Sequence, residues 1–131
     1  MTYFDDLVID RTKELPSVDG EGARRLMYML KHAINGGAMV LVDGGEVVSA
    51  SSELTDLLGY TTGDLQGDWQ SIFHPEDWEN VVLPHEQNNL AAPYGVRIKK
   101  KDKENFKWYA VEGLTVVLEN RKFRCLIVEE T

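Results

Sequence analysis

Cysteine and long hydrophobic runs are both scarce in this sequence. Cys125 is the only cysteine, which excludes an internal disulfide and is typical of a reducing cytoplasm. No apolar run approaches the roughly 20 residues that a membrane-spanning helix needs. The N-terminal stretch MTYFDDLVID has adjacent acidic residues and no basic region before an apolar run, which argues against a secretory signal. We therefore expect a cytoplasmic segment that makes no contact with a membrane.

Positive charge is also scarce, with 14 Lys and Arg residues against 22 Asp and Glu residues and a formal net charge of −8. An acidic surface repels phosphate backbones and anionic lipids, so we expect neither nucleic acid nor a membrane surface as a partner. The one basic run, from Lys99 to Lys103, lies at the end of an expected strand. We interpret it as a solvated turn, with an electrostatic docking patch as the alternative.

The length of 131 residues suits one domain, which we expect to be preceded by a flanking segment at residues 1–37. The start of that segment has loosely helical apolar spacing, which Pro16 ends. A stronger helix follows, with Asp19 as its cap and Asn35-Gly36-Gly37 at its end. Its apolar stripe either covers the domain's own sheet or packs against a second copy in a homodimer. The stripe comprises Leu26, Met27, Leu30 and Ile34.

Strand signals occur in two groups. Residues 38–43 and 46–50 are short apolar runs, and Gly44-Gly45 between them predicts a two-residue hairpin turn, because glycine enters positive-φ positions freely. Alternating apolar and polar residues return near the C-terminus. That second group comprises residues 94–99, 106–118 and 121–129.

Between the two groups of strands, helix caps and helix stops follow one another closely. The pair Ser51-Ser52 begins a short helix that Gly59 ends, and the pair Thr61-Thr62 begins another that ends at Gly67. The stretch DWQSIF forms a further turn, and HPEDW begins a fourth helix. We expect Pro84 to end or kink that helix and the polar stretch PHEQNNLAAP to be a loop.

These elements predict an α+β fold in which five strands form one antiparallel sheet. A lone hairpin and a lone three-stranded meander are each too small to be stable, so they must share the sheet. The short helices between them are also too short to stand alone and must lie across one face. A concavity between the sheet and these helices follows from that arrangement.

The order of these elements and four motifs resemble a PAS domain, the sensory module of bacterial and archaeal signalling proteins, over residues 38–131. VDGGEVVSASSELTDLLGYTTGDLQG resembles the family's hairpin, Gly-Tyr helix and Ser/Thr-x-x-acidic-Leu-x-Gly pattern. HPEDW resembles the start of its long helix, and VRIKKKDKENFKWYAV resembles its strand–turn–strand segment. Glu129 and Thr131 stand where the family has a terminal Asp-x-Thr, which relays a signal from the last strand to an output helix. Ser51 replaces the usual Asn cap and serves about as well.

The resemblance implies a sensory or regulatory module rather than an enzyme. A small molecule, or a packing change, in the cavity would shift the equilibrium between two arrangements of the domain and so alter a downstream output domain. Such a chain resembles part of a longer sensor, for example a histidine kinase in a two-component system. The alternative is a ligand-free interaction module whose function is dimerisation. Inward periodicity and the resemblance give the expected pocket lining as Leu57, Trp69, Ile72, Val82, Val96, Trp108 and Cys125.

No cofactor is implied by these motifs. The family's light-sensing flavin subgroup has a cysteine in the helical segment, whereas Cys125 lies on the last strand. His74 is expected to orient a helix start, and His85 does not match the haem-binding position of the family's long helix, so we expect neither haem nor a metal site. No Gly-x-Ser-x-Gly elbow or metal-spaced histidine pair supports catalysis. Glu112, within an apolar strand, faces either solvent or the pocket.

Overall fold

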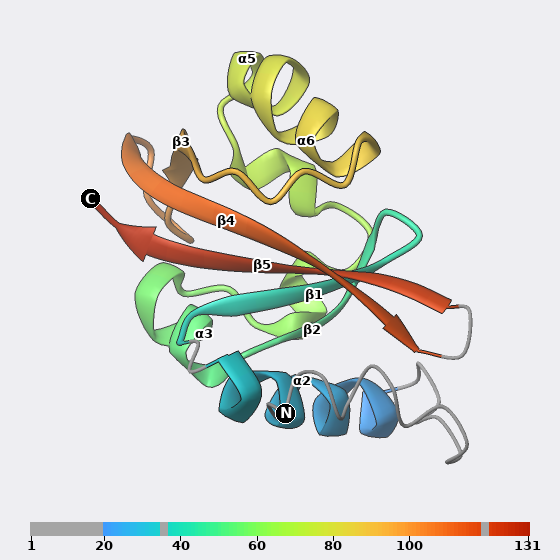
Figure 1. Ribbon diagram of the computed structural model, residues 1–131. Helices are drawn as coiled ribbons and strands as arrows, with labels where there is room; N and C mark the ends of the chain where they lie inside the picture. The colour runs from blue at the N-terminus through green and yellow to red at the C-terminus, as the bar shows by residue number, and fades with distance from the viewer. Residues whose placement is uncertain (1–19, 35–36, 119–120) are drawn as a thin grey trace.

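The computed structural model describes residues 20–34, 37–118 and 121–131. The expected helical spacing before Pro16, the cap at Asp19 and part of the helix end at Asn35-Gly36 lie outside the described residues. The side chain of Ile34 also lies outside them. The fold is α+β, with one sheet between a long helix and a set of short helices (Figure 1).

The sheet has five strands, and every pair of neighbours is antiparallel. Its order is β2-β1-β5-β4-β3, so the N-terminal hairpin and the C-terminal meander share one sheet as predicted. Gly44 and Gly45 have φ angles of 59° and 86°, which explains why the hairpin turn requires glycine. The strands are β1 (Met39–Asp43), β2 (Glu46–Ala50), β3 (Tyr94–Lys99), β4 (Phe106–Leu118) and β5 (Arg121–Glu130).

The short helices cover the face that we call the inner face. The predicted caps are confirmed: the Ser51 hydroxyl accepts from the backbone N–H of Leu54, and Gly59 ends that helix in the left-handed conformation. Thr61 and Asp64 form a capping box at the next helix. The short elements are α3 (Ser52–Leu58), α4 (Thr62–Leu65), η1 (Trp69–Ile72), α5 (Pro75–Asp77), η2 (Trp78–Val82) and α6 (Leu83–Gln87).

Pro84 was predicted to end or kink the helix, and it does not end it. A π turn, η2, immediately precedes it, and the N–H of Leu83 donates to the carbonyl of Trp78. Pro84 then lies in the first turn of α6, where its missing N–H is tolerated. Helix therefore continues to Gln87, so the first part of the expected loop PHEQNNLAAP is helical.

The outer face of the sheet is covered by α2 (Gly20–Ile34), which lies on the side opposite α5 and α6 (Figure 1). Leu26, Met27 and Leu30 are buried against β1, β4 and β5 residues. The predicted apolar stripe thus covers the domain's own sheet, one of the two roles expected for it. Hydrophobic cores therefore lie on both faces of the same sheet.

Both edges of the sheet are occupied by the chain itself. At the β2 edge, the N–H of Ala50 donates to Thr62 Oγ1 at 2.9 Å. At the β3 edge, the N–H of His74 donates to the carbonyl of Arg97 at 2.9 Å, and Phe73 forms a bridge with Ile98. These contacts block strand addition at those positions.

Candidate functional site

Five of the seven predicted pocket residues lie together on the inner face. Trp69, Ile72, Val82 and Val96 are buried in the core between the short helices and the sheet. Leu57 is partly buried and packs against the same core. Trp69 makes edge-to-face contacts with the rings of Phe73 and Trp78, at centroid distances of 5.7 and 5.1 Å. The structure therefore brings together the part of the predicted set that the helices and β3 supply.

Trp108 and Cys125 do not belong to that set, which corrects two of the predictions. The side chain of Trp108 is 54% exposed and lies under the guanidinium of Arg97. Cys125 is fully buried, but it belongs to the outer core beneath α2. Because both faces of the sheet are covered, both alternating sets of β5 residues are apolar, and the pattern alone does not say which set faces inward.

The environment of Cys125 is that of a core residue. Its Sγ lies 3.8 Å from Met39 Sδ, and burial raises the pKa of the Cys125 thiol to about 12. The thiol is therefore protonated at neutral pH. Glu112, whose face the sequence left open, is exposed to solvent and pairs across the sheet with Ile127.

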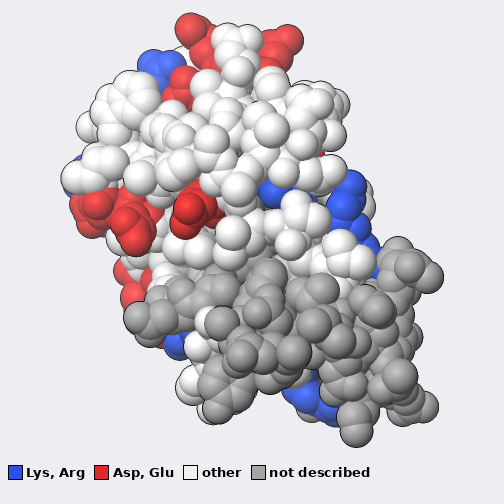
Figure 2. All heavy atoms as spheres, viewed as in Figure 1, with Lys and Arg blue, Asp and Glu red and all other residues white. Residues whose placement is uncertain are grey.

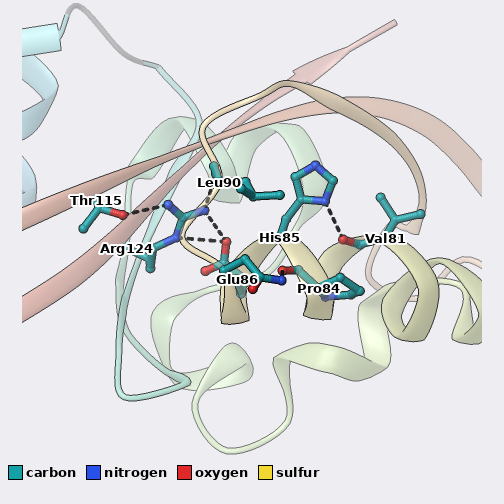
Figure 3. A network of polar contacts seen from close by, with 8 residues as sticks. Val81, Pro84, His85, Glu86, Leu90, Thr115 and Arg124 are labelled. Atoms are coloured by element: carbon teal, nitrogen blue, oxygen red, sulfur yellow. Dashed lines mark hydrogen bonds and ion pairs between the residues drawn. The ribbon is translucent and has the colours of Figure 1, made fainter.

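Sequence reasoning missed the most polar feature of the inner face, which is a buried network around Arg124 on β5. The Nε and Nη2 groups of Arg124 both donate to Glu86 Oε2, at 3.1 and 2.7 Å. Nη2 also donates to the carbonyl of Leu90 at 2.8 Å, and Nη1 donates to Thr115 Oγ1 at 2.9 Å. Figure 3 shows these groups converging from α6, the segment that follows it and the two long strands. The network ties α6 to the centre of the sheet.

Gly113 on β4 leaves the space that this network needs. A Cβ atom at position 113 would overlap Arg124 Nη2 and lie 3.0 Å from Arg124 Cζ and 3.1 Å from Leu126 Cδ2. The guanidinium therefore packs directly on the backbone of β4. A glycine inside a strand is a sequence signal of such a close approach. Together with an arginine in the apolar run of β5, that signal was the available clue to the network.

Two polar atoms near the network are buried without a hydrogen-bond partner. They are Glu86 Oε1 and the hydroxyl of Tyr94. Burial, together with the negative charge of Glu86, raises the pKa of Tyr94 well above its ordinary value, so its hydroxyl stays protonated. The ring of His85 packs on Tyr94, with centroids 4.4 Å apart, and His85 Nδ1 donates to the carbonyl of Val81. This end of the inner face thus combines a buried charge pair with unused hydrogen-bonding capacity.

A second ion pair fastens α5 to β3. Asp77 accepts from Arg97 Nε at 2.9 Å, from Nη2 at 2.8 Å and from the backbone N–H of Arg97 at 2.8 Å. The hydrogen bonds from the Arg97 side chain hold the pKa of Asp77 below its usual value. His74 begins α5 as expected, since its Nδ1 accepts from the N–H of Glu76. Asp77, in the motif HPEDW, therefore holds α5 on the sheet.

The proposed relay residues lie at the end of β5. Thr131 Oγ1 donates to the carbonyl of Trp108 at 3.0 Å, and Glu129 is exposed opposite Ala110. In the described part of the chain, no group of three or more His, Cys, Asp or Glu residues is placed to hold a metal ion. Within the same residues, no helix combines the length and apolar character that a membrane crossing requires.

Charged side chains of both signs are visible on the surface, with Lys and Arg at the right of the face in Figure 2. Asp and Glu side chains gather at the left and at the top of the face in Figure 2, with a broad uncharged area between them. The formal net charge of the chain is −8. The buried guanidinium of Arg124 is therefore a local positive group inside an acidic molecule.

Comparisons with known proteins find similarity in structure alone. No protein-family model and no curated protein matches the sequence. A PAS domain from a two-component sensor histidine kinase superposes with a TM-score of 0.61 at 12% identity, covering 82% of this chain and 99% of that one. The PAS domain of an HTR-like protein from Haloarcula marismortui has a TM-score of 0.59 at 14% identity, covering 82% and 98%.

A PAS domain from Colwellia psychrerythraea superposes with a TM-score of 0.58 at 18% identity, covering 72% of this chain and 85% of that one. At such low identity, the likeness concerns the fold, and it agrees with the element order and sheet topology described above. This chain has the fold of a PAS domain.

Proposed function

We propose that this chain is a sensory domain of a bacterial or archaeal signal-transduction protein. In this proposal, a small molecule binds at the inner face and shifts the domain between two arrangements of its sheet and helices. Binding biases the output only to the extent that the ligand prefers one arrangement over the other. The sequence motifs and the fold support the general role.

The observation that carries the ligand-sensing part is the buried polar end of the inner face. Most buried polar atoms in proteins are hydrogen-bonded, because a buried unpaired acceptor is destabilising by about 1–3 kcal/mol. Here Glu86 Oε1 and the Tyr94 hydroxyl remain unpaired beside a buried ion pair. Native proteins contain few such groups, and a binding partner for them is one explanation of their presence.

In this proposal residues 38–131 form the sensory domain, and residues 1–37 form a flanking segment that contains α2. The proposed relay runs through Glu129 and Thr131 to an output domain. The protein acts in the cytoplasm, is not itself catalytic, and binds neither nucleic acid nor membrane. Its acidic surface supports the last point.

A second candidate function is a ligand-free homodimerisation module. The exposed side of α2 favours it, since Tyr28 is 65% and Met29 is 44% exposed on a helix whose opposite side packs against the sheet. Exposed large apolar side chains of this kind are common at protein interfaces. We propose that α2 contributes to a homodimer in either case.

Native mass spectrometry of freshly purified protein tests the two candidates. A small molecule retained in stoichiometric amount, or a metabolite that raises the melting temperature, is the result expected for a sensor. A dimer that is empty and whose melting temperature no metabolite raises would overturn the sensory proposal and support the dimerisation module. An absorption spectrum of the same sample detects bound haem or flavin directly.

A further inference from the structure

Arg124 is held in place by groups other than its counter-ion. Among the residues that the structure describes, it is the only Lys or Arg that is buried. The carbonyl of Leu90 and the hydroxyl of Thr115 each accept one of its N–H groups, at 2.8 and 2.9 Å. The guanidinium also packs against the backbone of Gly113. Two of the four hydrogen bonds of the guanidinium are therefore made to groups other than Glu86, and these would remain if Glu86 moved away.

Glu86 is a poor partner for this guanidinium. A carboxylate bound to arginine in the favoured way uses both oxygens, one for each of two parallel N–H groups. Here Nε and Nη2 both donate to Oε2, and Oε1 is buried without a hydrogen bond. Because Glu86 is tethered to α6, its carboxylate reaches the guanidinium with one oxygen only. A free carboxylate that accepts with both of its oxygens would therefore be a better partner for Arg124 than Glu86 is.

We propose that Arg124 anchors a binding site for a small carboxylate ligand, and that Glu86 occupies this site as an internal competitor. The inference rests on the proposed sensory function and gives it a ligand class. When the ligand binds, its carboxylate takes the place of the Glu86 carboxylate, which moves into solvent with its charge. The number of buried charges does not change, so the exchange avoids the penalty of burying an additional ion.

Replacement of the Glu86 carboxylate by the ligand would change how α6 is attached to the sheet. Glu86 joins α6 to β5, so its release removes a side-chain tie between the helix and the sheet. Gln87, Asn88 and Asn89, directly after Glu86, are exposed, and Asn89 has a positive φ of 54°. The hydrogen bonds of Asn88 and Asn89 run to α6 itself, so within the described residues the bond from Arg124 to the carbonyl of Leu90 is the hydrogen bond to the sheet that remains. Ligand binding therefore favours an arrangement in which the end of α6 is held to the sheet by one contact fewer, through Leu90 and not through Glu86.

The geometry also limits the size of the ligand. The guanidinium packs on the backbone at Gly113, so space for the ligand is that which the Glu86 carboxylate vacates. A compact monocarboxylate fits this exchange, whereas a larger acid requires α6 to move further. The chain carries a formal net charge of −8, so selection of the anion depends on Arg124 locally and not on the field of the whole protein.

The test uses acetate as the probe and compares the wild-type chain with Glu86→Gln. Each protein is titrated with sodium acetate at constant ionic strength maintained with sodium chloride, and with acetamide as the neutral analogue. The readouts are the NMR signal of the Arg124 Nε–H group and the melting temperature. We expect acetate to shift the Arg124 signal in both proteins, with at least tenfold tighter binding in Glu86→Gln because the competitor has lost its charge. We expect no such effect from acetamide.

Equal affinities in the two proteins, or an unmoved Arg124 signal in the wild type, would overturn the proposal. If Glu86→Gln does not fold, the wild-type titration alone decides: a saturable Arg124 shift with acetate but not with acetamide supports the site, and its absence excludes it. A metabolite without a carboxylate that binds stoichiometrically at the inner face would contradict the carboxylate site but leave the sensory function in place. If the purified protein contains no ligand and no small molecule changes its melting temperature, both the carboxylate site and the sensory function are excluded.

Discussion

Gly113 is the residue at which the backbone of β4 comes closest to the guanidinium of Arg124. A methyl group at this position would overlap Nη2 and lie within 3.1 Å of Leu126 Cδ2. We expect Gly113→Ala to lower the free energy of unfolding by about 1–3 kcal/mol, since forcing extra volume into a packed site displaces side chains. Urea unfolding at neutral pH measures the change.

Gly95 on the neighbouring strand β3 provides the matched control. A Cβ atom there meets only the ring of Trp108, at 3.8 Å, which is an ordinary contact distance. We expect Gly95→Ala to be neutral or stabilising by up to about 1 kcal/mol, because alanine restricts the unfolded chain. If the two substitutions change stability equally, then Arg124 does not pack closely against the backbone of β4.

The thiol of Cys125 allows a second prediction for a single residue. Burial raises its pKa to about 12, so almost no thiolate exists at pH 7–8, and the side chain is inaccessible in the folded protein. We expect native protein to react with an alkylating reagent at least a hundredfold more slowly than the same protein in denaturant. Mass spectrometry of timed samples measures both rates. Rapid alkylation of folded protein would mean that the core beneath α2 opens readily.

At the scale of elements, Asp77 connects α5 to β3, and its charge makes this connection dependent on pH. The pKa of Asp77 is lower in the folded protein, chiefly because of hydrogen bonds from Arg97. Its stabilising contribution is therefore complete above the unfolded pKa of about 3.9 and is lost as the pH falls through the folded value. We expect Asp77→Asn to be less stable than wild type by about 1.5–3 kcal/mol at neutral pH, with the difference disappearing in acid. Urea unfolding between pH 2.5 and 7, values chosen to span that range, measures it.

Asp43→Asn is the control for this effect. Asp43 also pairs with an arginine, Arg121, but at 3.2 Å and with both side chains substantially exposed. Exposed ion pairs contribute less than about 1 kcal/mol, so we expect little change in stability at any pH. A pH-independent loss in Asp77→Asn would instead indicate that shape, and not charge, holds α5 to the sheet.

The elements that the sequence predicted correctly are those set by local chemistry. Gly44-Gly45 forces a hairpin turn, Ser51 and Thr61 cap helices, and Gly59 ends one, whatever the rest of the chain does. Alternation then identifies the three C-terminal strands, and the instability of small separate sheets requires one sheet. The five-stranded fold was therefore predictable without any information on distant contacts.

The face of each strand was harder to predict, because it depends on contacts between distant segments. With cores on both faces, Cys125 and Leu126 are equally apolar choices for the inside, and only the position of α2 separates them. Trp108 is large and apolar, but it does not belong to either core and is exposed beside Arg97. Arg124 was missed because its buried partner, Glu86, lies in a stretch that was expected to be a loop.

At the scale of the whole molecule, β5 links the two cores. Arg124 faces inward to α6, whereas its neighbours Phe123 and Cys125 face outward to the core beneath α2. A shift of this strand at the inner face therefore also changes the surface on which α2 packs. Interiors are close-packed, so such a displacement is transmitted and not absorbed. In the proposed sensory mechanism, the position of α2 on the sheet is where a change at the inner face would reach the proposed flanking segment.

Substitutions at two adjacent residues of α2 distinguish the packing of the helix on its own sheet from its role in a homodimer. Leu30 is fully buried against the sheet, whereas Met29 is 44% exposed on the same helix. We expect Leu30→Ala to lower the free energy of unfolding by about 2–5 kcal/mol, the usual cost of emptying a core site. Met29→Ala is expected to change it by less than about 0.5 kcal/mol and to weaken the proposed homodimer. Urea unfolding and sedimentation velocity measure the two effects. Equal stability of the two variants would show that α2 is not packed on the sheet in solution, and an unchanged dimer in Met29→Ala would place the interface elsewhere.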